Sequence, residues 1–121
     1  MLVYCMSISI DGFVADRDGD FGWTTPPDEV FDLHLELNRG VGVFLLGRRL
    51  YETMLGWETD PAMRAPPAHT AFADVWSAIP KVVFSRTLER VQGNARLAGR
   101  PPVEEVDAAR EATDLDVSIG G

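Results

Sequence analysis

Three arginines stand beside small or hydroxyl-bearing residues at two places along the chain. The first place is the segment Gly47-Arg48-Arg49, and the second is the segment Ser85-Arg86-Thr87. A guanidinium group pairs with phosphate through two parallel hydrogen bonds, hydroxyl groups add donors, and a glycine lets the backbone approach a ligand closely. The two segments therefore suit binding of a phosphate-bearing small molecule. Spacing alone leaves open the alternative that these arginines only solubilise the surface.

Each of these segments follows a stretch that is typical of a buried β-strand. Residues 41–46 are all apolar or glycine, as in a central strand covered on both faces, and residues 81–85 form a shorter strand. The carboxyl ends of neighbouring parallel strands meet at one edge of a sheet, which would bring both segments to one ligand. A helix that begins near Arg48 would add free backbone amides there.

The parts of the chain before and after these strands have their own patterns. Period-2 alternation over residues 2–10 predicts a first strand packed on both sides of the sheet, and residues 116–119 form the last strand. A first helix is expected after a cap at Thr25, with Pro26 and Pro27 in its first positions and an end at Gly40. Its apolar face would consist of Val30, Phe31, Leu33, Leu35 and Leu37.

Further helices complete an alternating order of strands and helices. They are expected around residues 48–55, 72–79 and 103–112, the second of them stopped by Pro80. Residues 11–23, 61–67 and 93–102 are expected to be irregular. Strands separated by helices imply parallel pairing through right-handed crossovers. The expected fold class is a three-layer α/β domain, with a mostly parallel central sheet and helices on both faces.

Length and charge restrict the class of protein. The 121 residues, 45% of them hydrophobic, suffice for one domain with a real core. A formal net charge of −8 would repel DNA and anionic membranes, so neither is expected as a partner, although local arginines can still hold a small anion. No signal peptide is visible and no apolar run approaches the ~18 residues of a membrane span, which predicts a cytoplasmic location.

The cysteine and the acidic residues do not predict a metal site. Cys5 is the only cysteine, so no intrachain disulfide can form, and it is expected to be a small buried residue rather than a nucleophile. Asp16, Asp18 and Asp20 imitate the opening of a calcium loop. The sixth position of that loop holds phenylalanine rather than glycine and the twelfth holds proline rather than glutamate, so we reject a calcium site.

Four segments together carry a resemblance to a known family. They read SISIDGF at residues 7–13, LLGRRLYE at 45–52, KVVFSRTL at 81–88 and DVSIGG at 116–121. In this order they resemble the dihydrofolate reductase superfamily, and the Gly-Arg-Arg segment is closer to small bacterial proteins related to the riboflavin-biosynthesis reductase domain. The resemblance implies a dihydrofolate-reductase-like domain that binds NADPH, acts as an oxidoreductase in the cytoplasm and forms a homodimer.

The resemblance also assigns roles to individual residues. It implies that Ser7, Val14 and Ala15 flank the nicotinamide ring. The pattern departs at Leu50, where relatives commonly place a threonine able to bond the pyrophosphate, so one cofactor hydrogen bond is missing from the expected set. The implied cofactor-binding residues in full are Ser7, Val14, Ala15, Gly47, Arg48, Arg49, Ser85, Arg86, Thr87, Gly120 and Gly121.

The implied chemistry is hydride transfer by the nicotinamide, for which a protein supplies orientation and electrostatics rather than a catalytic dyad. Folate reductases place a carboxylate near the start of the first helix, and Asp28 matches that spacing. Asp28 is therefore the candidate proton donor, with Phe31 one turn further on as the candidate wall of a substrate pocket. The alternative that Asp28 only stabilises the helix start stays open.

Two functions follow as expectations. The first is NADPH-dependent reduction of a small heterocyclic substrate, such as a pterin or an aminopyrimidine-like compound. The second is a non-catalytic nucleotide-binding or self-associating protein that keeps the fold, which Leu50 favours. Relatives continue beyond the glycine pair, so the chain is expected to be incomplete at its C-terminus and, alone, to be marginally stable or to pair an exposed edge with another copy.

Overall fold

The apolar run of residues 41–46 lies at the centre of a five-stranded parallel sheet. The computed structural model describes residues 1–20 and 27–120. The strand order is β1-β5-β2-β3-β4, and every neighbouring pair is parallel, which confirms the expected sheet. The strands are β1 (Leu2–Tyr4), β2 (Val41–Gly47), β3 (Lys81–Phe84), β4 (Ala95–Leu97) and β5 (Asp116–Gly120).

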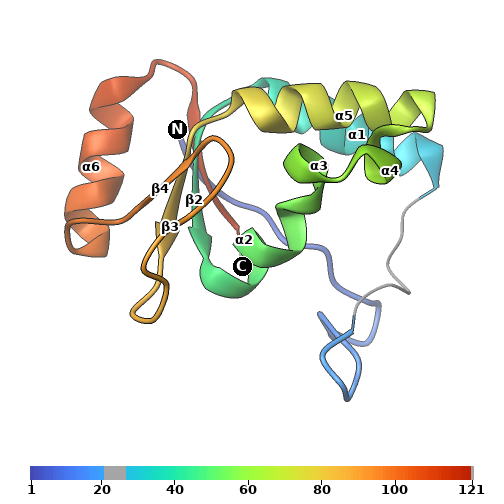
Figure 1. Cartoon of the computed structure of the whole chain (residues 1–121), viewed down its shortest axis with the longest axis horizontal. Helices are drawn as coiled ribbons and strands as arrows, with labels where there is room; N and C mark the ends of the chain where they lie inside the picture. The colour runs from blue at the N-terminus through green and yellow to red at the C-terminus, as the bar shows by residue number, and fades with distance from the viewer. Residues whose placement is uncertain (21–26, 121) are drawn as a thin grey trace.

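Helices cover both faces of this sheet, so the three-layer prediction is confirmed. Figure 1 shows α1 and α5, with the short helices α3 and α4, on one side of the sheet and α6 on the other side. The helix α2 directly follows β2 at the lower end of the sheet in this view. The helices are α1 (Asp28–Arg39), α2 (Arg48–Met54), α3 (Gly56–Thr59), α4 (Pro61–Arg64), α5 (Pro67–Ala78) and α6 (Pro102–Ala112).

Alternate residues of β2 enter two separate cores. Phe44 and Leu46 belong to the larger core, which contains the aromatic side chains of α3 and α5. Val43 and Leu45 belong to the smaller core, to which α6 contributes Ala109. Because successive side chains are buried on opposite faces, β2 is apolar throughout and shows no alternation of polar residues.

The first strand is much shorter than the alternation over residues 2–10 predicts. β1 ends at Tyr4 and lies at one edge of the sheet, where β5 is its neighbour. Leu2 is 42% and Tyr4 65% exposed, so the prediction of a strand packed on both sides is wrong. Cys5 is also exposed, contrary to the expected buried position. An edge strand without a covering helix leaves apolar side chains in solvent, which the sequence pattern alone does not reveal.

The first helix starts later than predicted. α1 begins at Asp28, and Pro27 is its N-cap residue with extended backbone, so Pro27 lies outside the first turn. Proline has no amide hydrogen to donate, and residues at a helix start do not need one. The sequence alone therefore does not distinguish a proline in the N-cap position from one in the first turn. Thr25 and Pro26 lie outside the described residues.

The buried face of α1 also differs from the prediction in part. Phe31 is buried, whereas Leu33 and Leu37 are 57% and 51% exposed. Val30 and Leu35, which lie near Phe31 around the helix, are half-buried. The apolar face that α1 packs against α5 is therefore narrower than the predicted face of five residues. The prediction that Leu33 and Leu37 belong to this face is wrong.

Two segments that were expected to be irregular contain regular structure. Residues 61–67 include α4 and the start of α5, and residues 93–102 include β4 and the start of α6. β4 pairs in parallel with β3, although no helix separates the two strands. A three-residue strand is too short to show a period, which explains why the sequence pattern missed it.

A carboxylate joins β4 to α6. Both oxygens of Glu105 accept hydrogen bonds from Arg96, at 3.1 and 2.6 Å, and one of them also accepts from the amide of Gly99 at 3.0 Å. The Glu105 side chain has no exposed surface. These bonds from Arg96 and Gly99 lower the pKa of Glu105 to about 2, although burial acts in the opposite direction.

We expect this pair to make the domain sensitive to acid. The pKa of Glu105 is lower in the folded chain, so its stabilisation is complete above about pH 4.5, the ordinary value, and is lost as pH falls toward 2. Since Arg96 is half exposed and its charge is screened, the loss should be about 1–2 kcal/mol rather than the ~3 kcal/mol of an unscreened shift. Urea unfolding of wild type and of Glu105→Gln at pH 6 and pH 3 measures the stabilisation that the ionised Glu105 contributes. The difference in stability between the two proteins should shrink by about half from pH 6 to pH 3, because pH 3 lies between the folded and the ordinary pKa of Glu105. Equal differences at both pH values would contradict the assignment.

Candidate functional site

The carboxyl ends of three adjacent strands meet at one edge of the sheet. Gly47 at the end of β2 pairs with Phe84 at the end of β3, and Leu46 pairs with Gly120 at the end of β5. The segments that begin at Gly47 and at Ser85 are therefore neighbours. This juxtaposition confirms the expectation that the two arginine segments leave the sheet side by side.

Arg48 connects these two segments directly. Its Nη1 donates a hydrogen bond to Thr87 Oγ1 at 2.7 Å, across 39 positions of sequence. Its Nε donates to Glu52 Oε1 at 2.8 Å, one turn further along α2. Ser85 Oγ accepts bonds from the amides of Thr87 and Leu88 at 3.2 and 3.1 Å, which fixes the turn after β3. A cation and two hydroxyl groups thus lie together at the strand ends.

Arg49, Arg86 and Gly47 are open to solvent. Arg49 and Arg86 are exposed and adjoin this cluster in the sequence, and the side chain of Arg48 is 47% exposed. A Cβ atom at Gly47 would meet no atom within 4 Å, so the backbone there is accessible to a ligand. Because α2 has only seven residues, guanidinium and hydroxyl donors rather than the helix dipole would provide most of the attraction for an anion.

Gly120 has different surroundings. A Cβ atom there would lie 2.7 Å from Leu50 Cδ2 and 3.3 Å from Leu46 Cδ2. A side chain at Gly120 would therefore force the Leu50 side chain to move. Gly121, which the sequence also proposes for the cofactor, lies outside the described residues.

The three residues expected beside a nicotinamide ring lie in the segment that follows β1. The amide of Cys5 still bonds to Ile119 O at 3.4 Å, so Ser7 leaves the sheet near the end of β5 and is exposed. Val14 and Ala15 belong to a loop that is folded by local bonds such as Ser9 N to Phe13 O at 2.8 Å. Figure 1 shows this loop, in blue, extending away from the sheet. Their assignment to the cofactor stays a prediction.

The candidate substrate residues lie on α1. Asp28 is exposed in the first turn, and Figure 1 shows the start of α1 at the outer end of the helical layer, apart from α2. Phe31 is 8% exposed and stacks on His69 with ring centroids 4.4 Å apart, with edge contacts to Trp57 and Phe72 at 5.8 Å. The structure thus gives Phe31 a packing role, and the proposed roles of both residues toward substrate stay predictions.

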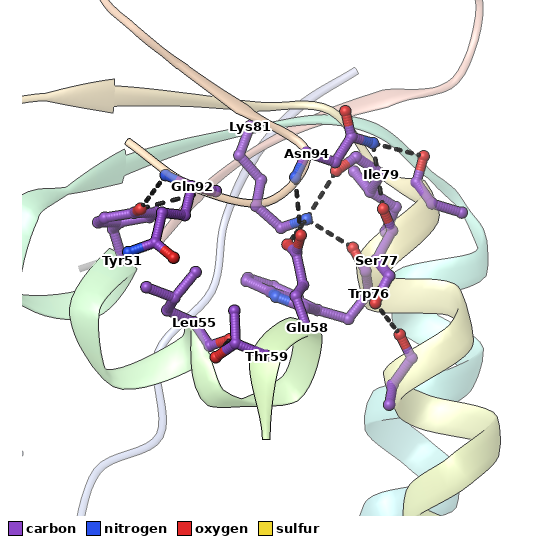
Figure 2. A network of polar contacts seen from close by, with 12 residues as sticks. Tyr51, Leu55, Glu58, Thr59, Trp76, Ser77, Ile79, Lys81, Gln92 and Asn94 are labelled. Atoms are coloured by element: carbon purple, nitrogen blue, oxygen red, sulfur yellow. Dashed lines mark hydrogen bonds and ion pairs between the residues drawn. The ribbon is translucent and has the colours of Figure 1, made fainter. Parts of the chain in front are cut away.

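A buried ion pair that the sequence did not suggest lies at the opposite end of β3. Figure 2 shows Lys81 and Glu58 pointing toward one another; Lys81 Nζ is 2.6 Å from Glu58 Oε1. Lys81 Nζ also donates to the carbonyls of Trp76 and Ile79 at 2.7 and 2.8 Å. Burial lowers the pKa of Lys81, while the bond to Glu58 and its charge oppose this shift. A lysine at the first position of a strand is usually exposed to solvent. The sequence therefore gives no sign that Lys81 is buried against Glu58.

The same network holds the loop between β3 and β4. The amide of Asn94 donates to Glu58 Oε2 at 2.7 Å, and the amide of Gln92 donates to Tyr51 Oη at 2.7 Å. Gly93, between them, has φ +72°, a conformation that favours glycine. The pair therefore joins α3, β3 and this loop in a structural role, away from the carboxyl ends of the strands.

The part of the chain that the structure describes contains neither a metal-binding cluster nor a membrane-spanning helix. Within residues 1–20 and 27–120, no group of three or more histidine, cysteine, aspartate or glutamate side chains could hold a metal ion. None of the helices in this part of the chain is long and apolar enough to cross a membrane.

Comparisons with known proteins agree with this fold. No curated protein sequence matches the chain. The crystal structure of a candidate riboflavin biosynthesis protein from Shewanella sp. PV-4 superposes with a TM-score of 0.66 at 23% identity, over 99% of this chain and 63% of that one. The present chain thus spans less than two thirds of the length of that protein. The family model of the RibD C-terminal domain matches residues 1–111, and the chain therefore belongs to the RibD C-terminal domain family.

Proposed function

We propose that this domain is an NADPH-dependent reductase of a small heterocyclic substrate, such as a pterin or an aminopyrimidine-like compound. Its family is a riboflavin-biosynthesis domain of reductase type. The observation that carries the proposal is the bond from Arg48 to Thr87, which holds a cation beside hydroxyl donors at adjoining strand ends. A bound NADPH would supply the hydride, and Arg48, Arg86 and Thr87 would hold its phosphate groups.

A direct assay tests the proposal. Purified protein is mixed with NADPH and a panel of pterins and aminopyrimidines, and loss of the reduced-nicotinamide absorbance is followed against reactions without protein and without substrate. Binding of NADPH is measured separately by titration calorimetry. We expect binding, and turnover with at least one substrate class. Failure of NADPH to bind would refute the proposal.

A second function is favoured by the surroundings of Gly120. Leu50 covers this glycine with an apolar side chain, and α1, which begins at Asp28, starts apart from α2 in Figure 1. Both features would suit a non-catalytic nucleotide-binding protein that retains the fold. NADPH binding without oxidation across the whole panel would support this alternative.

The proton donor is tested by Asp28→Asn. Loss of a charge in the first turn of α1 is expected to reduce the free energy of unfolding by about 0.3–1 kcal/mol through the helix dipole. If Asp28 also donates the proton, kcat should fall by about 100-fold or more with NADPH affinity unchanged. The neighbouring Glu29→Gln is the matched control and should alter only stability. A kcat equal to that of wild type would remove Asp28 from the mechanism.

We also propose that the chain self-associates as a homodimer through β1. This strand lies at the edge of the sheet, and Leu2 and Tyr4 expose apolar surface beside it. Sedimentation equilibrium should show a dimer, and Tyr4→Lys should shift the protein toward monomer by placing a charge on the edge. Leu37→Lys, on the exposed face of α1, is the control and should leave the assembly unchanged. A monodisperse wild-type monomer would contradict this prediction.

A further inference from the structure

The strand-end site is polar on one side and apolar on the other. β2 lies between β3 and β5 in the sheet. On the β3 side, Arg48 bonds to Thr87, and Ser85 Oγ lies 3.4 Å from Thr87 Oγ1. On the β5 side, Leu50 Cδ2 lies close over Gly120, together with the side chain of Leu46. Hydrogen-bond donors for an anion are thus concentrated beside β3.

An apolar cover affects a phosphate group in two ways. The methyl groups of Leu50 cannot donate a hydrogen bond, so a phosphate oxygen placed there would lose bonds to water without replacement. One of them, Cδ2, lies 2.7 Å from the position that a Cβ of Gly120 would take, and so fills the space beside the backbone there. Gly47, by contrast, has open space on the side where a Cβ would project.

We propose that Leu50 is a specificity-determining residue of this site. By covering Gly120, it keeps the diphosphate of a dinucleotide from bonding on the β5 side, so that recognition rests on a single phosphate monoester held by Arg48 and Thr87 on the β3 side. This inference rests on the proposed function, because it concerns the same nucleotide site. It predicts that the diphosphate adds little to affinity in the wild-type protein.

Two ligands that differ by the diphosphate and the ribose attached to it test the inference without turnover. Adenosine 2′-monophosphate carries the monoester, and 2′-phospho-ADP-ribose carries the monoester and the diphosphate but no nicotinamide. Titration calorimetry of wild type should give dissociation constants within about threefold of one another. Leu50→Thr should bind 2′-phospho-ADP-ribose about tenfold more tightly, the effect of one added hydrogen bond, and adenosine 2′-monophosphate within about twofold of wild type.

Two further variants of Leu50 distinguish the effect of opening space over Gly120 from the effect of adding a hydrogen-bond donor. Leu50→Ala opens Gly120 without adding a donor and should show a smaller gain for 2′-phospho-ADP-ribose, and it serves in place of Leu50→Thr if that variant does not fold. Leu50→Met keeps the apolar cover and should match wild type. Thermal melting of each variant verifies that it is folded.

The outcomes distinguish this inference from the proposed function. If wild type binds neither ligand, the proposed nucleotide site is wrong and the inference falls with it. If wild type binds adenosine 2′-monophosphate but the folded Leu50→Thr or Leu50→Ala variants gain nothing for 2′-phospho-ADP-ribose, only the role of Leu50 is overturned. A wild-type preference of about 30-fold or more for 2′-phospho-ADP-ribose would also overturn it.

Discussion

Replacing Glu58 by leucine alone is expected to lower the free energy of unfolding by about 3–5 kcal/mol. The Lys81 side chain is 2% exposed and that of Glu58 is 8% exposed, so water cannot replace the lost partner. The ammonium group would keep the carbonyls of Trp76 and Ile79 and its place over the Trp76 ring, 4.8 Å from the ring centroid, and none of these partners carries a full charge. Such a loss is a large part of the ~5–15 kcal/mol that stabilises a typical domain.

Removing both charges should be far less damaging. Burying two ions removes their hydration, and their mutual attraction barely offsets that cost. Replacing both by apolar residues of similar size therefore often leaves the free energy of unfolding unchanged. Glu58→Leu combined with Lys81→Met should therefore recover most of the loss, and urea unfolding of wild type, both single variants and the double variant measures the coupling. The exposed pair of Glu36 and Arg39 is the control, and Glu36→Gln should cost about 0.5 kcal/mol or less. A single Glu58→Leu variant as stable as wild type would contradict the buried-pair account.

The second large effect is expected on cofactor choice. NADPH differs from NADH by a 2′-phosphate, which carries nearly two negative charges at neutral pH. Arg48→Ala and Arg86→Ala should each weaken NADPH binding by about tenfold to a hundredfold, because a charge-assisted hydrogen bond contributes roughly 1.5–3 kcal/mol, and should leave NADH nearly unaffected. The bond of Arg48 to Thr87 holds its guanidinium beside the turn that contains Arg86, which supports a shared role.

Two controls make this prediction specific. Arg49→Ala should weaken NADPH and NADH by the same small factor, because Arg49 is assigned to the pyrophosphate that both share and that group is expected to add little to affinity. Arg39→Ala, at the end of α1, should affect neither cofactor. Titration calorimetry gives each dissociation constant. Equal losses for NADPH and NADH in Arg48→Ala and Arg86→Ala would show that these residues do not read the 2′-phosphate.

Much of the fold could be predicted because its central elements have strong local patterns. β2 is continuously apolar, α5 has a helical apolar period and is followed by Pro80, and Gly40 ends α1. From these patterns and the rule for parallel strands, the two arginine segments were expected side by side, and Arg48 indeed bonds to Thr87. The edge strand β1 and the three-residue strand β4 were mispredicted, because exposure and short length remove the signal.

The sequence by itself determined the fold class and the order of the main elements, since residue type and period suffice for these properties. The resemblance of four segments indicated the family, which the family model confirms. The tertiary structure decided which side chains meet. It placed Leu50 over Gly120 and Lys81 against Glu58, contacts between residues separated by 70 and 23 positions that no local pattern encodes. It also placed the start of α1, at Asp28, apart from α2. Such contacts depend on how whole helices pack against the sheet, and a packing arrangement is a property of many residues at once rather than of any segment.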